Sequence, residues 1–130
     1  MQLLKTFLVE DSAVIRHSLV ATLEELAPVE VVGTADDEES AVKWLTDADH
    51  HPELVIIDIF LKNGSGLGVL RRIQTLHKDT KLVVLTNYAT REMRNKCLAL
   101  GADRVFDKSN EIDALVAYCG QAAGSDAASY

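Results

Sequence analysis

Short apolar segments alternate with segments of helical periodicity along the chain. The strand-like segments are rich in Leu, Val and Ile, and those at residues 54–59 and 82–86 contain unbroken apolar runs. Such runs are typical of strands that are covered on both faces. The pattern predicts strands over residues 4–9, 29–35, 54–59, 82–86 and 104–107.

Between these segments, apolar residues recur at intervals of three or four, as in helices that bury one face. Gly101 follows the fourth such segment, where a left-handed cap is expected, and the acidic run at residues 36–39 suits a helix N-terminus. Five helices are therefore predicted. The residues that mark them are Ile15, Leu19, Leu23 and Leu26; Ala41, Trp44, Leu45 and Ala48; Leu67, Leu70, Ile73 and Leu76; Met93, Cys97 and Leu100; and Ile112, Leu115, Val116 and Cys119.

The regular alternation of strands and helices indicates βαβ units and a parallel α/β sheet with helices on both faces. Because crossovers between parallel strands are right-handed, all the strand C-termini lie at one edge. We expect one domain over residues 1–121. The small and polar residues 122–130 are expected to form a disordered tail.

Composition narrows the class of protein. A chain of 130 residues with 48% hydrophobic residues suits one compact domain. The formal charge of -7 disfavours direct binding to nucleic acid or to anionic membranes. The first residues have too little basic character and too short an apolar stretch to be expected to act as a secretory signal. No apolar run approaches the roughly 20 residues that a membrane span needs. Cys97 and Cys119 are interpreted as buried reduced thiols, which suits a soluble cytoplasmic protein.

Polar side chains follow four of the five predicted strands. Glu10 and Asp11 follow the first, Asp58 lies near the end of the third, Thr86 ends the fourth, and Lys108 follows the fifth. In open α/β sheets, ligands bind outside the carboxyl ends of the strands. We therefore expect these side chains to meet at one edge.

The carboxylates of this group are costly to bring together. If the first and third strands are neighbours, Asp11 and Asp58 lie about 5 Å apart, and like charges at that distance repel by about 3 kcal/mol at an effective dielectric constant of about 20. A cation with oxygen ligands, Mg²⁺ or alternatively Mn²⁺, relieves this repulsion. A carboxylate can also attack a phosphoryl group and form an acyl phosphate, and Lys108 can pair with a phosphoryl oxygen.

Each of these residues also has a simpler interpretation. Glu10 and Asp11 can precede a helix that Ser12 caps, Thr86 can be an ordinary strand residue, and Lys108 can be a surface lysine. Their joint placement favours the functional interpretation. The four histidines, His17, His50, His51 and His77, are interpreted as surface residues away from this edge.

The motifs closely resemble the receiver domain of bacterial two-component response regulators over about residues 4–120. The resemblance rests on FLVEDS at 7–12, LVIID at 54–58, LVVLT at 82–86, GAD at 101–103 and DK at 107–108. It implies a flavodoxin-like sheet in the order 2-1-3-4-5. It also implies transfer of a phosphoryl group to Asp58 from a histidine kinase, a phosphotransfer protein or a small phosphodonor, with Thr86 and Lys108 assisting. The implied Mg²⁺ ligands are Asp11, Asp58, the backbone carbonyl of Phe60 and, through water, Glu10.

Several positions depart from the family pattern. Val105 stands where receivers usually carry an aromatic ring that swings inward on activation, and strand alternation points Phe106 to the opposite face. Ser109 and Lys62 replace residues that are usually proline, which predicts a flexible loop at residues 62–66. The conformational switch is therefore expected to be muted or to use other groups.

Three further residues are expected to shape the site. Asn87 replaces the usual small residue after the threonine and narrows the site. Phe60 and Tyr88 lie two residues beyond Asp58 and Thr86, positions that flank the acyl phosphate in this family. We hypothesise that these rings slow hydrolysis of the phosphorylated form, the simpler interpretation being exposed aromatics at a loop rim.

The expected function is that of a phosphorylation-controlled interaction module rather than an enzyme. The module is expected either to act alone or to be part of a longer regulator. Because no helix-turn-helix or output enzyme is visible after residue 120 in this sequence, we expect it to signal to a downstream protein target through its fourth helix, fifth strand and fifth helix. On that face we expect Arg91, Arg94, Asn95, Arg104, Glu111 and Asp113.

Three other functions fit the sequence less well. A pseudo-receiver that docks partners without phosphorylation is suggested by Val105 and Ser109, but the complete acidic site argues against it. An aspartyl-phosphate phosphatase needs a second carboxylate where Phe60 stands. A P-loop nucleotide site is excluded because its glycine-rich motif is absent from the sequence.

Overall fold

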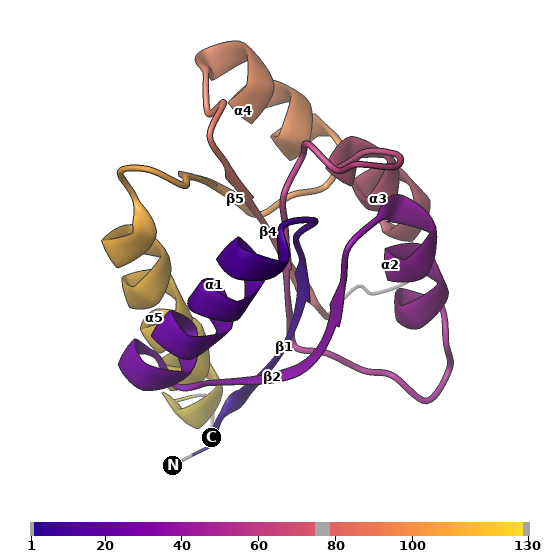
Figure 1. Cartoon of the computed structure of the whole chain (residues 1–130). Coiled ribbons are helices and arrows are strands. Elements are labelled where there is room, and N and C mark those ends of the chain that lie inside the picture. The colour runs from indigo at the N-terminus through magenta and orange to yellow at the C-terminus, as the bar shows by residue number, and fades with distance from the viewer. Residues whose placement is uncertain (1, 75–78, 129–130) are drawn as a thin grey trace.

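A computed structural model describes residues 2–74 and 79–128 (Figure 1). Strands and helices alternate along the chain, as the hydrophobic pattern predicts. The elements are β1 (Leu4–Val9), α1 (Ala13–Leu26), β2 (Val29–Ala35), α2 (Glu38–Leu45), β3 (Leu54–Ile57), α3 (Gly66–Ile73), β4 (Lys81–Thr86), α4 (Arg91–Ala99), β5 (Arg104–Asp107) and α5 (Ile112–Ala128). Leu76 and His77, which the sequence analysis placed near the end of α3, lie outside the described residues.

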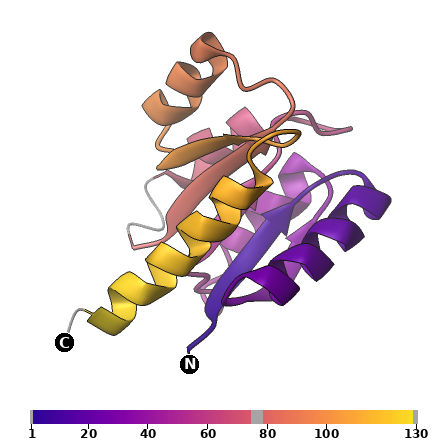
Figure 2. The same cartoon turned by 90° about the vertical axis from the view of Figure 1, so that its left-hand side faces the viewer.

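The strands form one parallel sheet in the order β2-β1-β3-β4-β5, which confirms the expected flavodoxin-like topology. Helices α1 and α5 cover one face of this sheet, and α2, α3 and α4 lie on the other (Figure 1). Figure 2, turned by 90°, shows α5 and α1 on the same side of the strands.

The central strand β3 divides the core in two. All of its residues are buried, and they point alternately to the two faces. Val55 and Ile57 pack in the cluster under α2, α3 and α4, whereas Leu54 and Ile56 pack in the cluster under α1 and α5. The apolar run in the sequence therefore marks a strand that is covered on both sides, as predicted.

Side-chain caps fix where the helices begin. Ser12, Asp37, Ser65 and Thr90 precede α1, α2, α3 and α4, and each accepts a hydrogen bond from a backbone N–H of the first turn. Such caps satisfy donors that a helix leaves unpaired. Gly101, with a φ of 106°, follows α4 in the left-handed conformation expected from the sequence.

Helix α5 is longer than expected. It continues to Ala128, so residues 122–128 are helical where the sequence analysis expected a disordered tail, and residues 129–130 lie outside the described part. This segment holds several alanines, the residue with the highest helix propensity, and Ala122 is buried against the core.

Trp44 joins α2 to the sheet through a stack of rings. Its indole packs on Phe7, with ring centroids 4.1 Å apart, and on His50, with centroids 3.9 Å apart. The Nδ1–H of His50 donates to the Trp44 carbonyl oxygen over 2.8 Å, since a carbonyl only accepts. His50 is half-buried and is not the surface histidine that was expected, whereas His17 and His51 are exposed.

Cys97 and Cys119 are buried free thiols, as the sequence analysis expected. Burial raises the pKa of Cys119 to about 11 and also raises the pKa of Cys97, which the charge of Lys96 only partly offsets. Within residues 2–74 and 79–128, none of the helices has both the length and the apolar character that membrane crossing requires.

We expect both thiols of the folded protein to resist Ellman's reagent at about pH 8, because thiolate is the reactive form and a raised pKa keeps its fraction small. In concentrated guanidinium chloride, both should react at once. Absorbance at the thionitrobenzoate band follows the reaction. Equal rates for folded and unfolded protein would show that the thiols are not buried.

Candidate functional site

The register of β1 and β3 brings the carboxylates together. Val9 pairs with Ile57 across the two strands, and the Asp58 N–H donates to the Val9 carbonyl oxygen over 3.0 Å. Glu10 and Asp11 therefore leave β1 beside Asp58. One carboxylate oxygen from each of these three acids lies within 4.8 Å of the others, about the separation expected from the sequence.

Glu10 is the most deeply placed of these acids. It is only 1% exposed, and its Oε2 accepts the Ser12 N–H over 3.0 Å. The Arg16 guanidinium donates to the Glu10 carbonyl oxygen over 2.8 Å. Asp58 is also buried, whereas Asp11 is partly exposed. Two carboxylates of the site, those of Glu10 and Asp58, are therefore buried, and the third, that of Asp11, lies nearer to solvent.

Lys108 is the cation of the site. Its Nζ donates to Asp58 Oδ2 over 3.0 Å and pairs with Glu10 Oε1. Burial acts to lower the pKa of this ammonium, but its hydrogen bonds to the two carboxylates and their charges outweigh burial, so the Lys108 pKa is raised. The ammonium therefore stays charged at neutral pH, and it is not the surface lysine of the simpler interpretation.

Thr86 is joined to Lys108 through the backbone. The residue is fully buried, and its carbonyl oxygen accepts the Lys108 N–H over 2.9 Å. Its Oγ1 accepts the Tyr88 N–H over 3.1 Å. The hydroxyl is therefore tied to the loop after β4, and Thr86 is not among the described residues that line the open cavity.

A cavity of about 200 Å³ opens above the acids. The Phe60 and Tyr88 rings contact each other edge to face at its rim, with centroids 4.7 Å apart, and both residues are more than half exposed. The cavity is lined by Glu10, Asp11, Ser12, Ile15, Asp58, Phe60, Asn87, Tyr88 and Lys108. A larger hollow of about 620 Å³ lies beside Leu26 and Pro28, but none of the site residues Glu10, Asp11, Asp58 and Lys108 lines it.

The expected departures at β5 are visible in the packing. Val105 and Phe106 are both buried and point to opposite faces, as strand alternation predicts. The guanidinium of Arg94 donates to the carbonyl oxygens of Val105 and Ala89 over 2.8 and 2.9 Å, and it pairs with Glu111 at 2.6 Å. An arginine thus joins the segments around Val105, a contact that the sequence did not indicate.

Two loops at the site are joined by polar contacts. The Ser109 hydroxyl donates to Asn87 Oδ1 over 3.1 Å. The loop at residues 62–66, which the absence of proline predicts to be flexible, is held by several backbone and side-chain bonds. Ser65 forms an antiparallel bridge with Phe60, and its N–H donates to Glu38 over 3.0 Å. Sequence analysis missed Glu38 because a contact across 27 positions leaves no local signal.

The donor set fits a hard divalent cation. Mg²⁺ prefers oxygen ligands and is commonly held by one or two carboxylates together with waters and phosphate oxygens. Glu10, Asp11 and Asp58 supply three negative charges, and Lys108 neutralises only one of them. The residues therefore have the chemistry and the spacing for such an ion. The roles of the individual residues stay predictions.

Comparisons with known proteins agree with this geometry. Residues 6–119 match the family model of the response regulator receiver domain. The chain is 31% identical over 107 residues to the transcriptional regulatory protein CitB of Klebsiella pneumoniae, covering 82% of this chain and 44% of that protein. It is 31% identical over 114 residues to the two-component response regulator PhoP of Pseudomonas aeruginosa, covering 88% and 49%.

A solved structure shares the fold. The response regulator domain of Thermotoga maritima CheB superposes with a TM-score of 0.82 at 21% identity, covering 95% of this chain and 98% of that one. The chain spans about half the length of the curated relatives that it matches. From the sheet, the acidic edge and the match over residues 6–119, the chain belongs to the response regulator receiver domain family.

Proposed function

We propose that Asp58 accepts a phosphoryl group and that the chain acts as a switch controlled by this modification. The observation that carries the proposal is the shared ammonium of Lys108, which bonds Asp58 and Glu10 while Asp11 lies beside them. A structural ion pair needs only one acid. Three acids around one lysine leave a site that is poised for a cation and a phosphoryl group.

The chain's own residues account for the transfer. A carboxylate oxygen of Asp58 attacks phosphorus, and the bond from phosphorus to the donor atom breaks, with its electron pair leaving on the donor. Lys108 offsets charge on the phosphoryl oxygens. The Thr86 hydroxyl accepts the Tyr88 N–H and keeps its own hydrogen to donate to a phosphoryl oxygen. Bound Mg²⁺, held by Asp11, Asp58, the Phe60 carbonyl and, through water, Glu10, would neutralise charge on the transferred group.

The partners follow from this chemistry. A histidine kinase or phosphotransfer protein supplies the phosphoryl group, and a downstream protein reads the result. The face of α4, β5 and α5 offers the exposed Arg104, whose guanidinium lies 5.3 Å from the centroids of both Phe106 and Tyr118. We place this function in the cytoplasm, where the two free thiols stay reduced.

Incubation with acetyl phosphate and Mg²⁺ should add one phosphoryl group to the protein, because the Asp58 carboxylate lines the cavity and bonds to Lys108, and its position matches that of the family's phosphoacceptor. Intact-mass spectrometry measures the gain. Asp58→Asn keeps the shape of the side chain but is a poor nucleophile, so its mass should not change.

A matched control is Asp79→Asn, which removes an exposed carboxylate that does not line the cavity. It should gain phosphate as the parent does. Equal masses for the parent with and without acetyl phosphate would instead support the constitutive docking module.

The aromatic rings at the rim of the cavity affect how fast water can hydrolyse the acyl phosphate. Phe60 and Tyr88 touch each other above Asp58, and both line the cavity through which water reaches the acyl phosphate. An in-line water needs space on the side opposite the Asp58 oxygen. Two rings in contact reduce that space, which supports slow hydrolysis.

We expect Phe60→Ala and Tyr88→Ala to shorten the lifetime of the phosphorylated form several-fold, since each opens the rim to water. Loss of the added mass over time, after removal of the phosphodonor, gives the rate. Leu98→Ala, an exposed apolar residue of α4 that does not line the cavity, is the control and should leave the rate unchanged. A parent half-life of seconds would contradict the role of the rings.

A further inference from the structure

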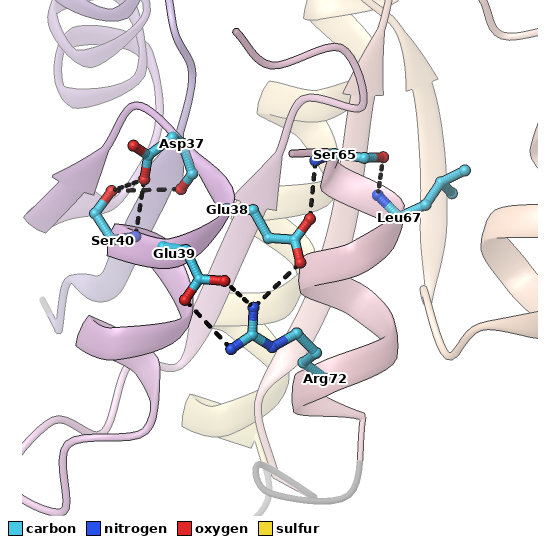
Figure 3. Close-up of polar contacts among 7 residues, drawn as sticks. All are labelled: Asp37, Glu38, Glu39, Ser40, Ser65, Leu67 and Arg72. Atoms are coloured by element: carbon cyan, nitrogen blue, oxygen red, sulfur yellow. Dashed lines mark hydrogen bonds and ion pairs between the residues drawn. The ribbon is translucent and has the colours of Figure 1, made fainter. Parts of the chain in front are cut away.

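Glu38 connects α2 to the loop that follows Asp58. Figure 3 shows its carboxylate between the two helices, with Oε1 accepting the Ser65 N–H over 3.0 Å and Oε2 accepting an N–H of Arg72 over 3.2 Å. Its backbone N–H donates to the Asn63 carbonyl oxygen over 3.1 Å. Glu38 therefore contacts the loop at both Asn63 and Ser65, and it also pairs with Arg72 of helix α3.

The neighbouring acid does not do this. Glu39 also pairs with Arg72, at 2.7 Å, but its side chain is 79% exposed, against 20% for Glu38. Among the described residues, the hydrogen bonds of the Glu39 side chain go to Arg72, and none goes to the loop. The two acids share a partner and differ in their contact with the loop, so Glu39 is a matched control for Glu38.

The backbone around Glu38 leaves room for this one side chain. A Cβ on Gly68 would lie 2.3 Å from Glu38 Oε1, and a Cβ on Gly64 would lie 2.4 Å from the Glu38 Cβ. A side chain at either position is incompatible with the present place of Glu38. The carboxylate also lies at the N-terminus of α3, where the helix dipole favours negative charge and a charged acceptor strengthens the bond to Ser65.

The loop carries this contact to the site. Ser65 is bridged to Phe60 across the loop, and the Gly66 N–H donates to the Ile59 carbonyl oxygen over 2.9 Å. The Phe60 N–H reaches Asp58 Oδ1 at 3.4 Å, and its ring contacts Tyr88. The position of Ser65 thereby sets the position of Phe60. The Phe60 backbone lies beside Asp58, and its ring lies at the rim of the cavity.

We propose that Glu38 is a positioning residue for the phosphoacceptor loop, residues 58–66, acting through its hydrogen bond to the Ser65 N–H. This inference rests on the proposed function for its consequence, because Phe60 belongs both to the expected metal ligands and to the rim. Without Glu38, the loop opens at Ser65, and the site must order Phe60 each time that it binds a metal ion.

The test compares Glu38→Ala and Glu38→Gln with Glu39→Ala. Hydrogen exchange with mass spectrometry reports on peptides that cover residues 59–66, and calorimetric titration with MgCl₂ reports metal affinity. Outer contacts of this kind typically change metal affinity by roughly tenfold or more. We expect Glu38→Ala to speed exchange of the loop and to weaken Mg²⁺ binding about tenfold, with Glu39→Ala close to the parent.

Phosphorylation should follow the same order. At subsaturating Mg²⁺, Glu38→Ala should gain phosphate from acetyl phosphate more slowly than Glu39→Ala, and excess Mg²⁺ should restore its rate. A residue that only stabilises the fold would not be rescued by the metal ion. Circular dichroism checks that each variant is folded. Glu38→Leu, which has no acceptor for the Ser65 N–H, replaces Glu38→Ala if the latter does not fold, whereas Glu38→Gln keeps an acceptor oxygen and should retain most of the loop contact.

Gly68→Ala tests the same contact from the other side. Alanine favours a helix more than glycine does, yet its methyl group displaces the Glu38 carboxylate, so this variant should loosen the loop without removing a charge. When combined with Glu38→Ala, the same substitution should have little further effect on loop exchange.

The outcomes separate the two proposals. Loop exchange and Mg²⁺ affinity that are equal in Glu38→Ala and Glu39→Ala would overturn the role of Glu38, even if Asp58 is phosphorylated. If Glu38→Ala loosens the loop but the parent takes no phosphate, the positioning of the loop stands and the proposed function fails.

Discussion

The site depends on negative charge that is crowded at one edge of a parallel sheet. Glu10 and Asp58 are buried there beside Asp11, and one ammonium, that of Lys108, bonds the first two. Buried carboxylates without compensation are costly. The fold tolerates them because Lys108 is held in place by its own backbone bond to Thr86 and because the edge remains open to a cation.

The sheet supplies this arrangement through its order. With β1 between β2 and β3, the residues after Val9 and Ile57 leave neighbouring strands at the same level. The pairing of Thr86 with Asp107 across β4 and β5 brings Lys108 to the same edge. The buried apolar strands thus fix the backbone, and their register alone places the polar residues that follow them close together.

The sequence predicted the strands, the helices and the convergence of the acids with Lys108, because periodicity and the ends of strands are local features. It predicted poorly what depends on contacts between distant segments. The bond from Glu38 to Ser65, the contacts of Arg94 with Ala89 and Val105, and the stack of His50 on Trp44 require loop geometry that no spacing reveals. The helical end of α5 was missed because its composition suits both a tail and a helix.

The most direct measurement is the free energy of unfolding in urea, with and without Mg²⁺, for the parent and for Asp11→Asn. If the acids form a cation site, Mg²⁺ at about ten times its dissociation constant should stabilise the parent by about 1.4 kcal/mol. Asp11→Asn should be more stable than the parent in EDTA, since it removes repulsion, and should gain little from Mg²⁺. Equal gains for both proteins, or none for the parent, would contradict the account.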